Sequence, residues 1–355
     1  MKELLSLTLG ISLFLTASAN CFAPALRQEA DRLGLLIGTA VNPAHFSEEQ
    51  YASTLMREFN MIEPENAMKW AAIRHERDRF DFTPGDTVVA FAEAHQMKVR
   101  GHTLVWAKYN PAWLRRGRFT PEQLSQLMRE HITTVVKHYA GRVFAWDVVN
   151  EAFNANGGLE HSIWYDRPGI GLADKGTAYI EQAFRSAREA DPRALLFYND
   201  YDAEGVNAKS DAIYAMVKDF KRRGVPLDGV GLQMHIFNLN DKNILSLAAN
   251  IARLTALGVE VHITEMDVAL PVGVTGSLVD PADLAKQADI YRFVTTTCLA
   301  NRGCTAIQTW GFTDKYTWIP EYTKGQKGDP LLFDKNYAPK SSYRAILDVL
   351  EKTRR

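Results

Sequence analysis

The sequence predicts an α/β protein that folds as a (β/α)8 TIM barrel in one domain. Short apolar runs that predict strands alternate with amphipathic stretches of helical spacing, and the alternation repeats eight times. The repeats span about 320 residues, which is enough for a barrel core of ~250 residues with loops added. Neither an internal repeat nor a composition shift typical of a linker interrupts them.

The eight predicted strands are rich in Leu, Ile and Val and end at polar residues. In chain order they are Leu35–Ala40, Asn60–Glu63, Lys98–Leu104, Val143–Val149, Ala194–Asn199, Gly229–Met234, Val259–Thr264 and Thr305–Thr309. The alternative, a doubly wound open sheet, would require a Gly-rich phosphate-binding turn after the first strand. The segment Gly38–Asn42 lacks that pattern, which favours the barrel.

Helix ends are marked between these strands. Thr120–Gln123 and Asp280–Asp283 each begin with a capping side chain followed by proline, the arrangement that favours a helix start. Gly224, Gly258 and Gly303 stand just before predicted strands, where we expect the C-caps of the preceding helices.

Composition excludes several classes of protein. Hydrophobic residues make up 46% and charged residues 23% of the 355-residue chain, which is typical of a globular protein rather than a disordered one. The 41 Lys and Arg nearly balance the 42 Asp and Glu. A nucleic-acid partner therefore has no electrostatic support, and no basic patch suggests a membrane surface.

The N-terminus predicts export. Residues 1–19 combine a charged start, the apolar run Leu4–Leu15 and the small-residue site Ala17–Ala19, as in a secretory signal peptide. The run is short for a membrane span of roughly 20 residues, so we expect no span after signal removal and a secreted protein, extracellular or periplasmic. An uncleaved anchor and lipidation at Cys21 are the alternatives.

Cysteine usage is compatible with an oxidising compartment. Cys298 and Cys304 flank a predicted turn and could close a small disulfide loop. Two buried free thiols are the alternative.

Two carboxylates are placed unusually. Glu151 directly follows Val148–Asn150, and Glu265 directly follows His262–Thr264, so both lie at the carboxyl ends of predicted strands. A carboxylate within or just beyond an apolar strand costs several kcal/mol unless it is paired or functional. In a barrel that end carries the chemistry, and the two strands would face each other across the barrel mouth.

Glycoside hydrolysis typically requires a pair of carboxyl groups that flank the scissile bond. One must be protonated to serve the leaving oxygen, and we expect the environments of the two to push their pKa values apart. His235 and Gln233 are candidate partners that hold Glu265 ionised, and Asp267 could orient His235. The nine His show no paired spacing typical of a metal site, and no G-x-S-x-G elbow supports a serine hydrolase, so we expect no metal and no cofactor.

Seven motifs in order resemble glycoside hydrolase family 10. They are Glu65–Trp70, Gly101–Trp106, Trp146–Glu151, Tyr198–Tyr201, Gly231–His235, Ile263–Asp267 and Trp310–Asp314. The resemblance extends from about Gly38 to Ile346. Members of this family are mostly endo-β-1,4-xylanases with a (β/α)8 barrel, so residues 20–355 are expected to form one catalytic domain of this kind.

The resemblance implies roles at matching positions. Glu151 resembles the general acid/base and Glu265 the nucleophile of a retaining double displacement, supported by His235 and Gln233. Asn150 would bind the 2-hydroxyl of the reacting sugar. The remaining implied substrate-binding residues are Glu65, Asn66, Lys69 and His102 on the non-reducing side, the aromatic walls Trp106, Trp310 and Trp318, and Tyr201.

The sequence departs from the family pattern in places. Met266 stands where an aliphatic residue is more usual, and Asp202 stands where Asn is frequent. The segment 318–328 carries two Lys and two Gly in place of an Arg-containing stretch. We expect no carbohydrate-binding module after residue 346.

The implied protein is a secreted, retaining endo-1,4-β-xylanase that acts on xylan and xylo-oligosaccharides, and nothing demands more than a monomer. Two alternatives remain. One is a hydrolase of β-1,4-glucan or aryl glycosides on the same barrel. The other is a non-catalytic sugar-binding or inhibitor protein, which the presence of both Glu151 and Glu265 argues against.

Overall fold

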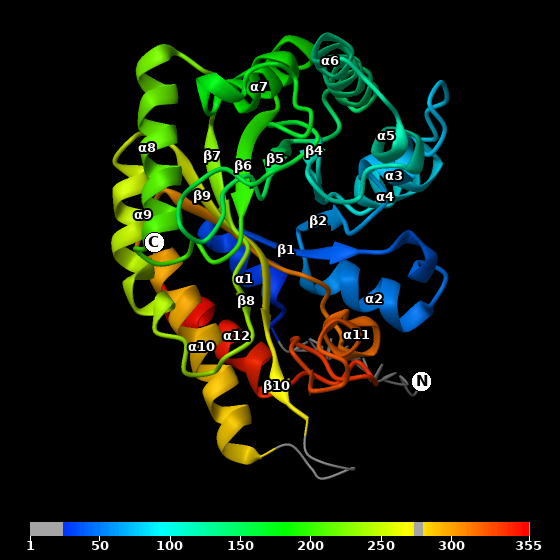
Figure 1. Ribbon diagram of the computed structural model, residues 1–355. Helices are drawn as coiled ribbons and strands as arrows, with labels where there is room; N and C mark the ends of the chain where they lie inside the picture. Colours follow the sequence, from blue (N-terminus) through cyan, green and yellow to red (C-terminus); the bar gives the residue numbers. More distant parts are fainter. Residues whose placement is uncertain (1–23, 273–279, 355) are drawn as a thin grey trace, which may run out of the picture.

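The computed structural model describes residues 24–272 and 280–354. Within them, eight parallel strands form a closed barrel, because β1 pairs with both β2 and β11, and β11 pairs with β9 (Figure 1). These strands are β1 (Leu36–Val41), β2 (Met61–Pro64), β3 (Lys98–Gly101), β5 (Ala145–Asn150), β6 (Leu195–Asp200), β7 (Gly229–Leu232), β9 (Glu260–Val268) and β11 (Cys304–Thr309). The predicted (β/α)8 barrel is confirmed. The predicted signal peptide, residues 1–19, and Cys21 lie outside the described residues.

Four two-residue strands accompany the barrel: β4 (Val105–Trp106), β8 (His235–Ile236), β10 (Leu270–Pro271) and β12 (Lys327–Gly328). Four predicted strand boundaries were wrong by two residues or more, and two of them bear on the site. The third strand ends at Gly101, and the chain resumes pairing with β5 only at β4. The strand predicted to end at Thr264 continues to Val268, because its extension pairs with β8. Glu265 therefore lies within a strand rather than after one.

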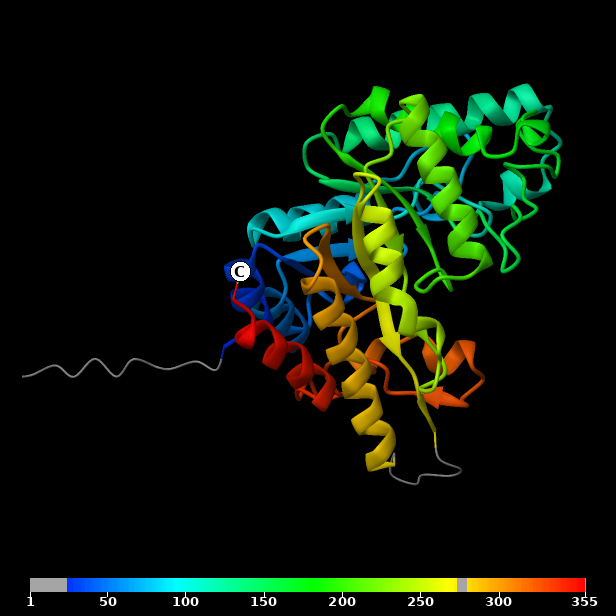
Figure 2. The ribbon, with the colours of Figure 1, turned by 90° about the vertical axis from the view of Figure 1, so that its left-hand side faces the viewer.

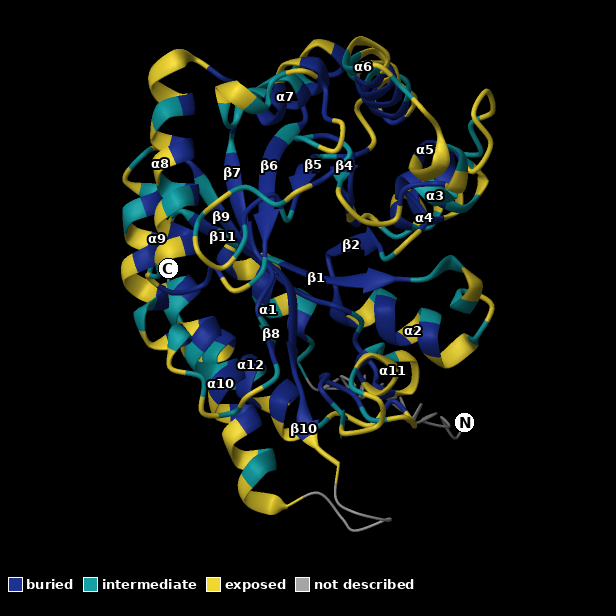
Figure 3. Ribbon diagram, in the orientation of Figure 1, coloured by how far each residue is buried: buried dark blue, intermediate teal, exposed yellow. Residues whose placement is uncertain are grey.

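Helices surround the strands, and α12 packs against α1 and α10 (Figures 1 and 2). The α-helices are α1 (Leu26–Leu33), α2 (Glu49–Glu58), α3 (Trp70–Ile73), α4 (Thr83–Ala94), α5 (Ala112–Arg116), α6 (Pro121–His138), α7 (Ala178–Ala190), α8 (Ala208–Arg223), α9 (Leu247–Thr255), α10 (Pro281–Leu299), α11 (Ile319–Tyr322) and α12 (Ser341–Lys352). The 3-10 helices are η1 (Pro43–His45), η2 (Ala173–Lys175), η3 (Asn243–Ser246) and η4 (Asp314–Tyr316). The strands are buried and the outer helix faces are exposed (Figure 3). Among the described helices, none has the length and apolar character needed to cross a bilayer.

The helix starts follow the predicted chemistry. Thr120 and Gln123 form a reciprocal capping box on α6, and Asp280 accepts a hydrogen bond from the Ala282 amide at 2.8 Å. Gly224 ends α8 in the left-handed conformation. The expected C-cap at Gly303 was wrong, because α10 ends at Leu299. Gly303 instead allows close approach, since a Cβ there would lie 2.4 Å from Thr255 Cγ2.

A disulfide joins α10 to β11. Cys298 and Cys304 are bonded, with their Cα atoms 5.1 Å apart, and both are fully buried. The bond closes the turn between the helix and the strand.

The α6 helix buries a histidine without hydrogen-bond partners. His131 is fully buried, and its ring stacks on Trp70 with centroids 3.6 Å apart. Neither ring nitrogen has a hydrogen-bond partner among the described residues. Desolvation, with the positive charge of Arg74, lowers the pKa of His131 well below its ordinary value of 6.5.

We predict that His131 makes the fold sensitive to acid. Because its pKa is lowered on folding, the unfolded state binds the proton more readily, so stability falls as pH falls below about 6.5. In His131→Phe the loss of unfolding free energy between pH 7 and pH 5 should shrink by up to ~2 kcal/mol. Urea unfolding at the two pH values measures it, with His75→Phe as an exposed control. Equal pH dependence in His131→Phe and wild type would contradict the assignment.

Candidate active site

Two carboxylates meet at the carboxyl ends of the barrel strands. Glu265 lies in β9 and is 4% exposed, and Glu151 follows β5 directly. Glu151 has a φ of 55°, a conformation rarely adopted by side chains other than Gly, Asn and Asp. Its amide donates to Asn199 O at 2.9 Å, which fixes this turn against β6. The strain is of the kind found at functional sites.

The Glu265 carboxylate is held by two side chains, one from β6 and one from β8. Asn199 Nδ2 donates to Oε1 at 2.7 Å, and His235 Nε2 lies 3.2 Å from Oε2. His235 Nδ1 lies 3.0 Å from Asp267 Oδ1. Burial acts to lower the pKa of His235, but Asp267 and then Glu265 outweigh it and raise the pKa well above its ordinary value. A positively charged imidazole therefore lies beside the Glu265 carboxylate.

The Glu151 carboxyl is surrounded by donors. Trp106 Nε1 and Lys108 Nζ each lie 2.9 Å from Oε2. On the other oxygen, Oε1, Gln233 Nε2 lies 3.2 Å away and Asn150 Nδ2 3.4 Å away. Burial acts to raise the pKa of Glu151, but Lys108, Gln233 and Trp106 outweigh it, so the pKa is lowered.

The general acid must carry a proton when it serves the leaving oxygen, and the lowered pKa opposes this. The sequence motifs did not predict the contact with Lys108, whose ammonium lies directly against the carboxylate. Charge contact of this kind favours the ionised form.

A hydrogen-bonded path connects the two glutamates. Asn150 Oδ1 accepts from Asn199 Nδ2 at 3.0 Å and from Gln233 Nε2 at 3.2 Å. Gln233 was expected to support Glu265, but its side chain contacts Glu151, and only its backbone carbonyl bonds Glu265, through the Glu265 amide at 3.0 Å. Asn199 was not predicted as a site residue, although its position at the end of a predicted strand was the available signal.

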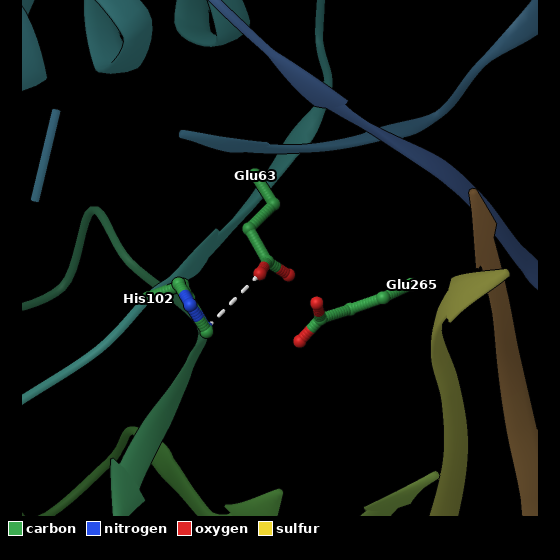
Figure 4. Close-up of side chains that lie close together, drawn as sticks. All are labelled: Glu63, His102 and Glu265. Carbon is green, nitrogen blue, oxygen red and sulfur yellow. Dashed lines mark ion pairs between the residues drawn. The ribbon is translucent and has the colours of Figure 1, made fainter. Parts of the chain in front are cut away.

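A buried ionic cluster lies beneath Glu265. Glu63 from β2 and Glu265 from β9 turn their carboxylates toward each other, with His102 beside them (Figure 4). His102 Nδ1 lies 3.5 Å from Glu63 Oε1 and 3.0 Å from Asp147 Oδ2, so His102 is tied into the barrel interior. Burial, followed by the charge of Asp147, raises the pKa of Glu63 well above its ordinary value.

This cluster has the donor types of a cation site, since ligand atoms of Glu63, His102 and Glu265 lie within 4.8 Å of one another. A cation is already built into it, because Arg100 Nε lies 3.3 Å from Glu63 Oε2 and the same guanidinium also bonds Asp147. The Arg100 guanidinium therefore supplies the positive charge that a bound cation would bring to this cluster.

Lys69 lies close to the Trp106 and Trp310 rings on one side of the site. Its Nζ donates to Asn66 Oδ1 at 2.9 Å and lies 5.1 Å from the Trp106 ring centroid and 5.5 Å from that of Trp310. Burial lowers the pKa of Lys69, with Glu265 opposing this effect. Glu65, expected in the same group, is half-buried, and its amide bonds Val41 O at 2.9 Å.

Two further expected residues lie on the other sides of the mouth. Trp318 donates from Nε1 to Asp267 Oδ2 at 2.8 Å, and its ring centroid is 5.2 Å from that of His235. The Tyr201 ring lies 3.5 Å from Lys209 Nζ, which is itself 2.6 Å from Asp200 Oδ1. The structure thus brings the expected residues around one mouth.

Trp70, Trp113 and Trp164 hold loops together through hydrogen bonds from their indole N–H groups. Trp164 is buried and donates to Trp106 O at 2.9 Å, and Trp113 donates to Arg74 O at 3.0 Å. Trp70 bonds the Leu104 carbonyl.

Known proteins match this chain along nearly its whole length. The family model of glycosyl hydrolase family 10 matches residues 25–349. Endo-1,4-beta-xylanase B of Thermotoga neapolitana is 44% identical over 330 residues, covering 92% of this chain and 92% of that protein. Beta-1,4-xylanase of Dictyoglomus thermophilum is 40% identical over 319 residues, covering 88% and 87%. The crystal structure of xylanase 10B from Thermotoga petrophila RKU-1 in complex with xylobiose superposes with a TM-score of 0.87 at 46% identity, covering 92% and 97%. The chain belongs to glycosyl hydrolase family 10.

Proposed function

We propose that this protein is an endo-1,4-β-xylanase that hydrolyses internal β-1,4-xylosidic bonds of xylan with retention of configuration. The observation that carries the proposal is the pair Glu151 and Glu265, which stand at one barrel mouth in unlike surroundings and are linked through Asn150, Gln233 and Asn199. Similarity to proteins named as xylanases supports the substrate.

The proposed reaction uses the two carboxyl groups in turn. A Glu265 oxygen attacks the anomeric carbon while the bond to the leaving oxygen breaks, and Glu151 gives that oxygen its proton. In the second step Glu151 removes a proton from water, whose oxygen attacks the anomeric carbon and releases Glu265. Charged His235 and the amide of Asn199 contact the two oxygens of Glu265 and orient its carboxylate for attack.

The surrounding residues suit a xylose chain. Lys69, His102, Glu65 and Asn66 offer polar contacts to sugar hydroxyls, and indole rings match the apolar face of the sugar. Lys69 Nζ lies 5.5 Å from the Trp310 ring centroid, and we expect these two side chains to crowd the hydroxymethyl group of glucose. This crowding supports xylan over β-1,4-glucan as substrate.

We further propose that the protein is exported through residues 1–19. The disulfide between Cys298 and Cys304 supports an oxidising compartment.

Incubation with glucuronoxylan and with carboxymethyl-cellulose tests the substrate. We expect short xylo-oligosaccharides from xylan only, released as the β-anomer. Equal release from both polymers would favour the broader glucanase alternative. Release of the α-anomer would overturn the double displacement. Binding of xylo-oligosaccharides without turnover would favour the non-catalytic alternative.

We predict that Glu265→Gln loses xylan turnover by roughly 10⁴-fold or more, because no nucleophile remains. Binding of xylo-oligosaccharides, followed by calorimetry, should persist, since the amide keeps the shape of the side chain. Turnover near the wild-type rate would show that Glu265 is not the nucleophile.

We predict that Glu151→Ala depends on the leaving group. Its kcat/KM should fall by roughly 10²–10⁴-fold on xylo-oligosaccharides, whose leaving oxygen needs a proton. The loss should be far smaller on aryl xylosides with activated leaving groups. Parallel assays on both substrates measure the ratio, and equal losses would contradict an acid role.

A further inference from the structure

Lys108 is the exposed member of the group around Glu151. It follows β4 at the barrel mouth, and its side chain is 62% exposed. Its Nζ lies 2.9 Å from Glu151 Oε2, 5.5 Å from the Trp106 ring centroid and 5.8 Å from the Tyr201 ring centroid. The motifs of the sequence assign it no role.

The four side chains that contact the Glu151 carboxyl all donate hydrogen bonds to it. An ionised carboxylate accepts from all of them, whereas a protonated carboxyl carries an O–H that needs an acceptor. A proton on Oε2 therefore requires that a donor leave this oxygen. Trp106 is held in place because β4 pairs with β5 and its carbonyl accepts from Trp164 Nε1 and Asn110 Nδ2. Gln233 and Asn150 are each 2% exposed. The flexible, exposed Lys108 stem is the donor that can withdraw at least cost.

We propose that Lys108 competes with the catalytic proton for Oε2 of Glu151, and that this positioning residue thereby sets the alkaline limit of the reaction. The inference rests on the proposed function, in which Glu151 must be protonated to serve the leaving oxygen. Lys108 acts through Glu151 and need not touch the sugar.

Other titratable groups face the Glu151 carboxyl from every side but are engaged elsewhere or do not contact it. They are Lys69 before α3, Asp200 and Tyr201 at the end of β6, Glu160 in the segment after β5, Tyr179 in α7 and Glu265 across the mouth. Lys69 bonds Asn66, and Asp200 pairs with Lys209. Among the described residues, Lys108 is thus the charged side chain in contact with Glu151.

The direction of the effect follows from the charge. The pKa of the acid in the free enzyme appears as the alkaline limb of the kcat/KM profile. A cation beside the carboxylate lowers that pKa, so its removal should move the limb to higher pH. The exposure of Lys108 weakens the effect, and added salt weakens it further.

The experiment compares pH profiles of kcat/KM on xylo-oligosaccharides for wild type, Lys108→Met and Lys108→Arg. The alkaline limb of Lys108→Met should lie roughly 0.5–1 pH unit higher, after allowing for exposure. Lys108→Arg keeps the cation and should keep the limb. Raising the salt concentration should move the wild-type limb upward but not that of Lys108→Met. Lys221→Met, at the exposed end of α8 away from the mouth, controls for the loss of one positive charge.

Activated aryl xylosides complete the test, since their departure needs no proton and the shift should be absent with them. Superimposed limbs of Lys108→Met and wild type on xylo-oligosaccharides, or a shift to lower pH, would overturn the inference while leaving the proposed function intact. Wild-type protein that releases nothing from xylan would overturn both.

Discussion

The buried guanidinium of Arg100 is the interaction on which the site depends. From β3 it contacts Glu63 of β2 and Asp147 of β5, and its Nη1 lies 2.8 Å from His262 Nδ1 of β9. All four side chains are almost completely buried. Without this cation, two carboxylates would stand uncompensated in the barrel interior, which is strongly destabilising. Arg100 thus ties four strands together and provides a charged floor below Glu265.

The two glutamates above this floor are held in different ways. The partners of Glu265 come from within the barrel wall, and the imidazole of His235 is fixed between Glu265 and Asp267. Trp318 then donates to the second oxygen of Asp267, so a residue from the segment after β11 also supports the nucleophile's neighbour. Glu151 instead stands on a left-handed turn at the rim, where one of its partners is exposed. The nucleophile is fixed by the interior, while the acid/base stands where its charge can be altered.

The order of the strands, the capped helix starts and the ring of polar residues at one end follow from sequence pattern, because periodicity and caps are local properties. Contacts between side chains on different strands do not follow from sequence pattern, because they depend on the tertiary structure. Asn199 lies in β6, and Gln233, with a similar amide side chain, directly follows the adjacent strand β7. Only the register between these strands decides that Gln233 contacts Glu151 while Asn199 contacts Glu265. Glu265 was placed after its strand because the pairing of β8 with β9, which extends the strand, is also a tertiary contact. The Lys108 contact depends on how the loop after β4 turns back over the mouth.

The working pH of the reaction should therefore be easier to change by substitution at exposed Lys108 than by substitution in the buried cluster around Arg100. A substitution at Arg100 removes the guanidinium that both Glu63 and Asp147 contact, and endangers the fold together with the chemistry. A substitution at Lys108 removes an exposed cation, whose pairing contributes little to stability. The same exposed contact nevertheless acts on the proton that the reaction requires. The working pH can therefore change through the loop after β4, which carries Lys108. The nucleophile Glu265 stays in place, because its partners belong to the buried interior.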